Sequence, residues 1–211
     1  MRTILKGVEP RSLTDHRQAP GANYENYQDK ETLRAHLVRE QRGLCCYCMK
    51  MIRAEHGAMK IEHWHSQTGH RDEQLRYTNL LGACMGGEGA SFAGQHCDTR
   101  KEDRELSRNP ADRMHRVEEL TRFLGDGRVL SQDPLFDAEL NEVLNLNLPF
   151  LMNNRKAVLD AFKDGFAKRG DLPRALLQKW LQDWNGDSDQ GALRPYCQVV
   201  VYWLRKRLAR A

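Results

Sequence analysis

The spacing of apolar residues predicts helices near the start of the chain and throughout its second half. Leu33, Leu37 and Val38 recur at helical spacing after Asp29, a residue type that caps helix N-termini, and the pattern stops at Gly43. The same periodicity in the second half predicts four further helices. These lie around residues 135–144, 151–166, 172–184 and 195–208.

Short strands are expected where apolar and polar residues alternate. Residues 59–64 alternate in this way, and residues 77–83 can pair with them. A second hairpin is expected over residues 117–130, turning at Gly125-Asp126-Gly127. Paired strands in a small lobe, together with a mainly helical second half, predict an α+β fold.

Three other segments carry weaker signals. Residues 1–28 place proline and glycine among polar residues without clear periodicity, which predicts an extended arm lying on the main body. Residues 85–96 contain several glycines and predict a loop that is mobile or faces a substrate. The charged stretch 97–106 is expected to be helical.

The character of the chain changes near Pro110, where we expect a soft domain boundary. Residues 1–110 would hold the arm and a small lobe, and residues 111–211 would form a mainly α-helical extension. Three tryptophans of this extension fall at helical spacings among leucine and valine, which favours packing in the core or at a partner interface over base stacking. They are Trp180, Trp184 and Trp203.

The composition allows one domain or two small ones, since 40% of the 211 residues are apolar and 29% are charged. The longest apolar run, residues 199–204, is far shorter than the ~20 residues that cross a bilayer, and residues 1–6 lack the apolar stretch of a signal peptide. We therefore expect a cytoplasmic protein without a membrane partner. The formal net charge of +4 is compatible with nucleic-acid binding but does not establish it.

Four of the cysteines are spaced like metal ligands. Cys45 and Cys48 share one turn, and Cys84 and Cys97 could complete a tetrahedral set of four sulfurs around a structural Zn²⁺. Such an ion can contribute on the order of 10 kcal/mol to folding, enough to hold together a small lobe with few apolar residues. Cys197 is left over.

The cysteine pattern also leaves other ligand sets open. Cys46 competes with Cys45 for the first position, and His65, His70 or His96 could replace a thiolate. A further alternative is that the four cysteines are ordinary small buried residues without a metal.

A candidate reaction centre lies between the two pairs of cysteines. Glu62 and His63 are adjacent, and a carboxylate beside a histidine can supply a metal ligand next to a general base. An imidazole with a pKa of about 6.5 can deprotonate water near neutral pH. An isolated histidine is more often a buried, hydrogen-bonded residue than a catalytic one. The catalytic interpretation of Glu62 and His63 therefore depends on their position between the cysteines and on Asn79, which follows them.

In order and spacing these residues resemble the HNH, or ββα-metal, endonucleases, many of which carry a Cys-x-x-Cys pair on either side of the active site. The match covers roughly residues 43–106. It implies that His63 is the general base and that Asn79 orients this base or its loop. Glu62 and Asp98 would hold a catalytic Mg²⁺ or Mn²⁺ ion through oxygen, while zinc stays on sulfur.

The resemblance further implies that Lys101 and Arg100 contact the substrate, and it singles out one branch of the family. Asp98 stands where the family usually has His or Asn, and the glycine-rich segment splits the second pair of cysteines. Cys84-Met85-Gly86-Gly87, followed by His96-Cys97-Asp98, is similar to the nuclease subunit of Septu-type antiphage systems, also found in some retron systems and often called PtuB.

That branch implies both a function and partners. We expect a metal-dependent endonuclease that hydrolyses phosphodiester bonds as the effector of an antiphage defence complex. The implied partner is an ATPase (PtuA-like) that controls the nuclease, joined in retron versions by a reverse transcriptase with its DNA–RNA product. DNA is the preferred substrate, and RNA, including transfer RNA, is the alternative.

Two hypotheses without catalysis compete with this one. In the first, the zinc shapes a binding module whose basic residues contact phosphates. These residues are Arg71, Arg76, Arg100 and Lys101. In the second, the helical half docks to an oligomeric partner such as the ATPase, and the small lobe has no reaction of its own.

Overall fold

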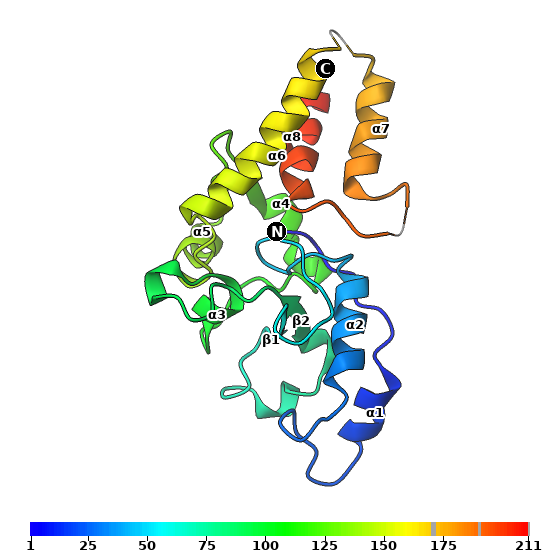
Figure 1. Ribbon diagram of the computed structural model, residues 1–211, viewed down its shortest axis with the longest axis vertical. Coiled ribbons are helices and arrows are strands. Elements are labelled where there is room, and N and C mark those ends of the chain that lie inside the picture. Colours follow the sequence, from blue (N-terminus) through cyan, green and yellow to red (C-terminus); the bar gives the residue numbers. More distant parts are fainter. Residues whose placement is uncertain (170–171, 190, 211) are drawn as a thin grey trace.

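The computed structural model describes residues 1–169, 172–189 and 191–210, and these form eight α-helices and two small antiparallel sheets (Figure 1). The predicted α+β fold class is confirmed. The helices are α1 (Arg11–Arg17), α2 (Lys30–Glu40), α3 (Cys97–Lys101), α4 (Val117–Leu120), α5 (Pro134–Ala138), α6 (Pro149–Ala167), α7 (Arg174–Asn185) and α8 (Cys197–Leu208). The strands are β1 (Lys60–His63), β2 (Leu80–Ala83), β3 (Thr121–Phe123) and β4 (Val129–Ser131).

A short helix interrupts the N-terminal segment that the sequence predicts to be extended. α1 follows Pro10 and buries Leu13, which joins Leu33 and Leu37 of α2 in a small apolar cluster. A seven-residue helix with one buried side chain gives no periodic signal, because a period needs at least two positions on the same face. The prediction of an unbroken extended arm is therefore wrong at α1.

The helix predicted from Asp29 is confirmed as α2. The Asp29 side chain accepts a hydrogen bond from the Thr32 amide and so caps the first turn. At the other end, the buried side-chain amide of Gln41 donates to the carbonyls of Leu44 and Gly82, both at 2.8 Å, and accepts from the Gly82 amide. These bonds hold the end of α2 against β2.

The first sheet consists of β1 and β2, paired in the order that the sequence predicts. Glu62 lies opposite Leu81, and His63 lies opposite Leu80. Residues 77–79 form a 3-10 turn, so β2 begins later than predicted. All four residues of β2 are buried, which places the sheet inside the lobe.

α3 follows the sheet and is shorter than the predicted helix over residues 97–106. It ends at Lys101 because Glu102 adopts a φ of 52°, outside the helical region. The charged residues beyond this point lie in a loop. The order sheet, loop and short helix is the frame that carries the candidate site.

The glycine-rich segment 85–96 forms a loop that closes on itself. The amide of His96 donates to the Gly86 carbonyl at 2.8 Å. Gly86 has a φ of +58°, and a Cβ atom there would lie 2.3 Å from the His96 carbonyl oxygen, so the position requires glycine. Closure brings Cys97 back beside Cys84. Contact between this loop and a substrate stays a prediction.

The second hairpin and the later helices also follow the predicted order. β3 pairs with β4, with Thr121 opposite Ser131, but the residues before β3 form α4 instead of strand. The helix predicted over residues 135–144 is α5 followed by the π-helical turn Glu139–Val143. α6, α7 and α8 match the last three predicted helices and pack together at one end of the molecule (Figure 1). No helix in the described ranges is both long and apolar enough to cross a membrane.

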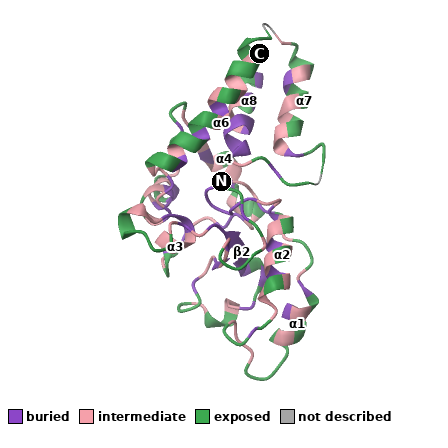
Figure 2. Ribbon diagram, viewed as in Figure 1, coloured by how far each residue is buried: buried purple, intermediate pink, exposed green. Residues whose placement is uncertain are grey.

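One apolar core contains residues from both halves of the chain. Leu81 of β2 and Val199 of α8 belong to it, and the amide of Cys97 donates to the Leu144 carbonyl at 2.9 Å. Buried residues gather around β2 and along α8 (Figure 2). The predicted boundary near Pro110 stays a prediction. Residues 170, 171, 190 and 211 of the second predicted region lie outside the described residues.

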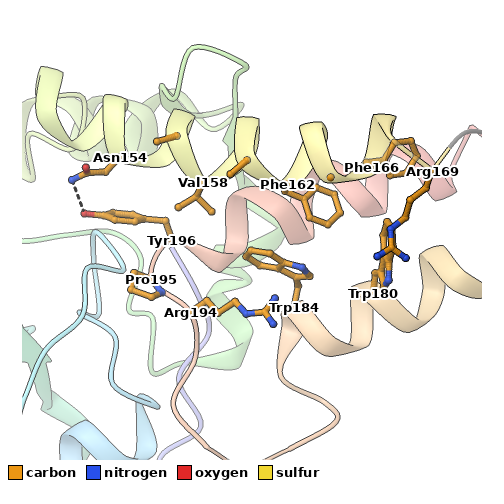
Figure 3. Close-up of a pocket in the computed structure, with 13 residues that line it drawn as sticks. Asn154, Val158, Phe162, Phe166, Arg169, Trp180, Trp184, Arg194, Pro195 and Tyr196 are labelled. Carbon is orange, nitrogen blue, oxygen red and sulfur yellow. Dashed lines mark hydrogen bonds between the residues drawn. The ribbon is translucent and has the colours of Figure 1, made fainter.

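The tryptophans of the helical region pack around Phe162 of α6. Their rings lie edge-on to this phenylalanine, with centroids 5.5 to 5.7 Å away. They are Trp180, Trp184 and Trp203. Trp180 and Trp184 also line a pocket of about 710 Å³ beside α6, where Arg194 lies over the Trp184 ring (Figure 3). These contacts agree with the predicted packing role.

A buried arginine fastens the second hairpin to α6. Arg155 is 1% exposed, and its guanidinium donates to the carbonyls of Gly127 at 2.6 Å and Leu146 at 2.7 Å. Gly127 has a φ of +88°, and a Cβ atom there would lie 2.0 Å from the Met152 carbonyl oxygen, so the turn sits directly on α6. Burial lowers the pKa of Arg155 to about 10, which leaves the group charged at neutral pH.

We expect Arg155→Met to lower the free energy of unfolding by about 3 kcal/mol, because two buried carbonyls lose their donor. Chemical denaturation of the purified chain measures this. The matched control is Lys156→Met, at an exposed neighbour paired with Asp160, where we expect a change below about 0.5 kcal/mol. Equal stability of the two variants would show that the buried hydrogen bonds do not hold the hairpin.

Candidate functional site

Four buried cysteines from three parts of the chain come together beside the first sheet. One sulfur from each of Cys45, Cys48, Cys84 and Cys97 lies within 4.8 Å of the others. The Cys45 and Cys97 sulfurs are 3.9 Å apart, and the Cys48 and Cys84 sulfurs are 3.7 Å apart. In a tetrahedral zinc site with Zn–S bonds of about 2.3 Å, sulfurs lie about 3.8 Å apart. The cluster could therefore hold a metal such as zinc.

Backbone amides point at these sulfurs, as they do where thiolates bind a metal. The Lys50 amide donates to the Cys48 sulfur at 3.5 Å, and the Cys84 amide donates to the Cys45 sulfur at 3.3 Å. Directly after Cys48, Met49 adopts a φ of 65°, which turns the chain before Lys50. Amide donors stabilise the charged form of a sulfur, the form that binds metal.

The other ligands that the sequence left open lie outside this cluster. Cys46 and Cys197 are both buried and neither belongs to the set of four. His96 packs against the cluster, with Nε2 at 3.7 Å from the Cys84 sulfur. His65 and His70 belong to a separate group of side chains.

Glu62 is the most enclosed carboxylate of the candidate site. Its side chain is 2% exposed, accepts a hydrogen bond from the Tyr47 hydroxyl at 2.6 Å and lies 3.1 Å from the Lys101 ammonium. Burial, followed by the negative charge of Asp98, raises the pKa of Glu62 well above its usual range. A bound cation would reverse this shift, because it favours the ionised carboxylate.

His63 has one ring nitrogen engaged and one available. Nε2 lies 3.0 Å from the Gln74 carbonyl, to which only a protonated nitrogen can donate, so Nδ1 is the free acceptor of the neutral ring. The edge of this ring packs against Tyr24, with centroids 4.4 Å apart. Burial lowers the pKa of His63 to about 4, and the ring is therefore neutral at physiological pH.

Glu62, His63 and Asp98 line one pocket of about 310 Å³. Glu102 and Asp103 add further carboxylates to its lining, while Lys60 is its one ammonium group within the described chain. The Lys60 nitrogen lies 4.0 Å from an Asp98 oxygen and 3.5 Å from a Glu88 oxygen. The pocket is acidic overall and suits a cation better than a bare phosphate.

Asn79 fastens the loop that leaves β1 and does not line the pocket. Its side-chain oxygen accepts from the His65 amide at 2.8 Å, and its nitrogen donates to the carbonyls of His65 at 3.0 Å and Glu73 at 3.2 Å. That Asn79 orients the base or its loop stays a prediction. The Asn79 side chain holds the backbone at His65, two residues after His63.

The two residues predicted to contact a substrate have other partners. Lys101 is buried, and its ammonium donates to the His63 carbonyl at 3.1 Å besides facing Glu62. The Arg100 guanidinium lies over the Phe92 ring, 3.5 Å from its centroid. In these positions Lys101 contacts Glu62 and the His63 backbone without lining the pocket. Arg100 packs against the glycine-rich loop.

Sequence reasoning missed two tyrosines and a lysine at this site. Tyr47 lies between Cys45 and Cys48 and reaches Glu62, so its place inside the Cys-x-x-Cys turn was a usable signal. Tyr24 comes from the N-terminal arm, where nothing in the sequence marks it. Lys60 precedes the Glu62-His63 pair by two positions, the strand period that puts it on the same face as Glu62.

A scan against models of known protein families and a search of curated proteins each gave no match to this chain. What the site can do must therefore follow from its own residues. The arrangement offers a buried set of four thiols for a soft or borderline metal. Beside it, the pocket combines the carboxylates of Glu62 and Asp98, among others, with a neutral imidazole whose Nδ1 can accept a proton.

We expect the purified chain to contain one zinc ion and Cys84→Ser to lose it, because a hydroxyl is a poor substitute for a thiolate. Loss of the ion should destabilise the chain by several kcal/mol, about the scale on which structural zinc contributes to folding. Metal analysis by mass spectrometry and thermal unfolding measure both effects. Cys197→Ala, at a buried cysteine outside the cluster, should keep its zinc. Full zinc content in Cys84→Ser would contradict the assignment.

Proposed function

We propose that this protein is a metal-dependent endonuclease of the HNH, or ββα-metal, type. Its likeness is to the PtuB nuclease subunit of Septu and retron antiphage defence systems. One observation supports this function above the others: Glu62, His63 and Asp98 line the same pocket, between a two-stranded sheet and a short helix. The thiol cluster at the edge of that sheet supports it further.

His63 is the general base in this proposal. Its Nε2–H is fixed on the Gln74 carbonyl, so Nδ1 keeps a lone pair to accept a proton from a water molecule. The lowered pKa of His63 keeps that lone pair free at neutral pH. The water, once deprotonated, attacks the phosphorus of a phosphodiester and displaces one ester oxygen.

Glu62 and Asp98 would hold the divalent ion of this reaction. The donor set fits Mg²⁺ or Mn²⁺ because both ligands are carboxylate oxygens in an acidic pocket. When bound, the ion would stabilise the negative charge of the phosphate and the leaving oxygen. Lys101 acts as a positioning residue, since its buried ammonium holds Glu62 in place. Lys60, at the pocket lining, is the better candidate for contact with a substrate phosphate.

The same likeness suggests a partner and a substrate. We propose that an ATPase similar to PtuA controls the nuclease and that the chain acts in antiphage defence, with a retron reverse transcriptase and its DNA–RNA product in some systems. DNA is the preferred substrate. RNA, including transfer RNA, remains the alternative, because hydrolysis needs only a phosphodiester and a positioned water.

We expect His63→Ala to lower cleavage by about a hundredfold or more, the scale of general-base catalysis. The chain would be purified with the products of its neighbouring genes, then incubated with labelled DNA and RNA, Mg²⁺ or Mn²⁺, and ATP present or absent. His56→Ala, an exposed histidine outside the pocket, is the matched control. Zinc content must stay equal in both variants.

Two outcomes would contradict the proposal. If His63→Ala cuts as fast as the control, the assigned base is wrong. If the unaltered chain binds nucleic acid but cuts neither DNA nor RNA under any of these conditions, the zinc-stabilised binding module is the better description.

We expect Tyr47→Phe to raise the Mg²⁺ concentration for half-maximal cleavage about fivefold. The hydroxyl donates a hydrogen bond to Glu62, and a lost bond of this kind costs about 1 kcal/mol. Tyr27→Phe is the control, because that hydroxyl bonds Ser12 in the separate apolar cluster of α1 and α2. Metal dependence that is unchanged in Tyr47→Phe would remove Tyr47 from the positioning of Glu62.

A further inference from the structure

Three side chains outside the proposed catalytic pocket form a second group of metal-ligating atoms. His65 follows β1, His70 precedes the 3-10 turn Arg71–Glu73, and Glu105 lies in the loop after α3. One ligand atom from each of the three lies within 4.8 Å of the others. None of them lines the pocket that contains Glu62.

The two imidazoles lie face to face and share one carboxylate neighbour. The rings of His65 and His70 stack with centroids 4.3 Å apart and planes inclined by 19°. His70 Nε2 is 3.4 Å from a Glu105 oxygen. The Glu105 side chain is 48% exposed, so it is free to change rotamer when an ion binds.

His65 already has the carboxylate partner that many metal-binding histidines have. Its Nδ1 lies 2.7 Å from a Glu73 carboxylate oxygen and donates to it, which leaves the Nε2 lone pair free. A carboxylate behind a ligating histidine fixes the tautomer and raises the basicity of the ligand. Asn79 also holds the His65 backbone through both its amide and its carbonyl. The ligand is therefore fixed in position before any ion arrives.

We propose that His65, His70 and Glu105 form a second metal site for a borderline divalent ion such as Zn²⁺. Two nitrogens and one carboxylate oxygen are a ligand set that zinc adopts where further positions stay open to water. The partial exposure of all three side chains gives an ion access from solvent. This inference does not depend on the proposed nuclease activity.

An ion at this site would clamp one wall of the neighbouring pocket. Ser66 and Gln67, which line that pocket, lie in the loop between the two histidines. The Ser66 amide is 3.5 Å from the same Glu105 oxygen, and the Thr68 hydroxyl donates to Asp103 at 2.9 Å. The ion would add a coordinate link between this loop and the segment after α3, beside the hydrogen bonds that join them now.

The test is a Zn²⁺ titration of the full-length chain against a chromophoric chelator, after its cysteine site has been filled. The unaltered chain should bind a second Zn²⁺. His70→Ala and Glu105→Gln should weaken this second binding at least about tenfold, and Glu73→Gln, behind the ligand, by about tenfold. Retention of the first, cysteine-bound zinc in each variant shows that the fold is intact.

Two controls separate this site from its neighbours. His56→Ala, at an exposed histidine elsewhere, and Glu62→Gln, in the catalytic pocket, should leave the affinity for the second ion unchanged. The proposal is overturned if the unaltered chain takes up no second Zn²⁺, or if His70→Ala and Glu105→Gln bind it as tightly as the controls. It is also overturned if Glu62→Gln alone removes the second ion, which would place that ion in the catalytic pocket.

Discussion

Four sulfur atoms gathered within 4.8 Å of one another constrain every element around the candidate site. They come from the turn after α2, the end of β2 and the start of α3, so one ion would fix three segments that are distant in sequence. The lobe has short strands and short helices, which supply little stability by themselves. With these segments fixed, the end of β1 and the first turn of α3 must face each other across the pocket.

Charge balance explains why this pocket suits a cation. Two carboxylates, Glu62 and Asp98, lie close enough to affect each other, and Glu62 is buried. The Lys101 ammonium, which does not line the pocket, lies beside a Glu62 oxygen and offsets part of its charge. The Tyr47 hydroxyl donates a hydrogen bond to the same Glu62 oxygen. Asp98, Glu102 and Asp103 add further carboxylates to the pocket lining beside the neutral His63 ring. This is the electrostatic arrangement in which a hard divalent ion and a base can act on one phosphate.

The sequence predicted the parts whose signal is local. α2 has its apolar period and its Asp29 cap, and each of the four cysteines lies at a turn or an element end. The sequence did not predict the features that depend on contacts between distant segments. α1 buries one residue, Leu13, and so carries no apolar period. Lys101 and Arg155 are charged residues on helices, a pattern typical of solvent-facing positions, and only the packing of distant segments around them explains their burial.

X-ray absorption at the zinc edge of the purified chain, measured without added zinc, tests the sulfur-bound metal most directly. The account predicts one zinc ion surrounded by four sulfurs at about 2.3 Å. A chain that folds without zinc, or a first coordination shell made of nitrogen and oxygen instead of sulfur, would contradict it.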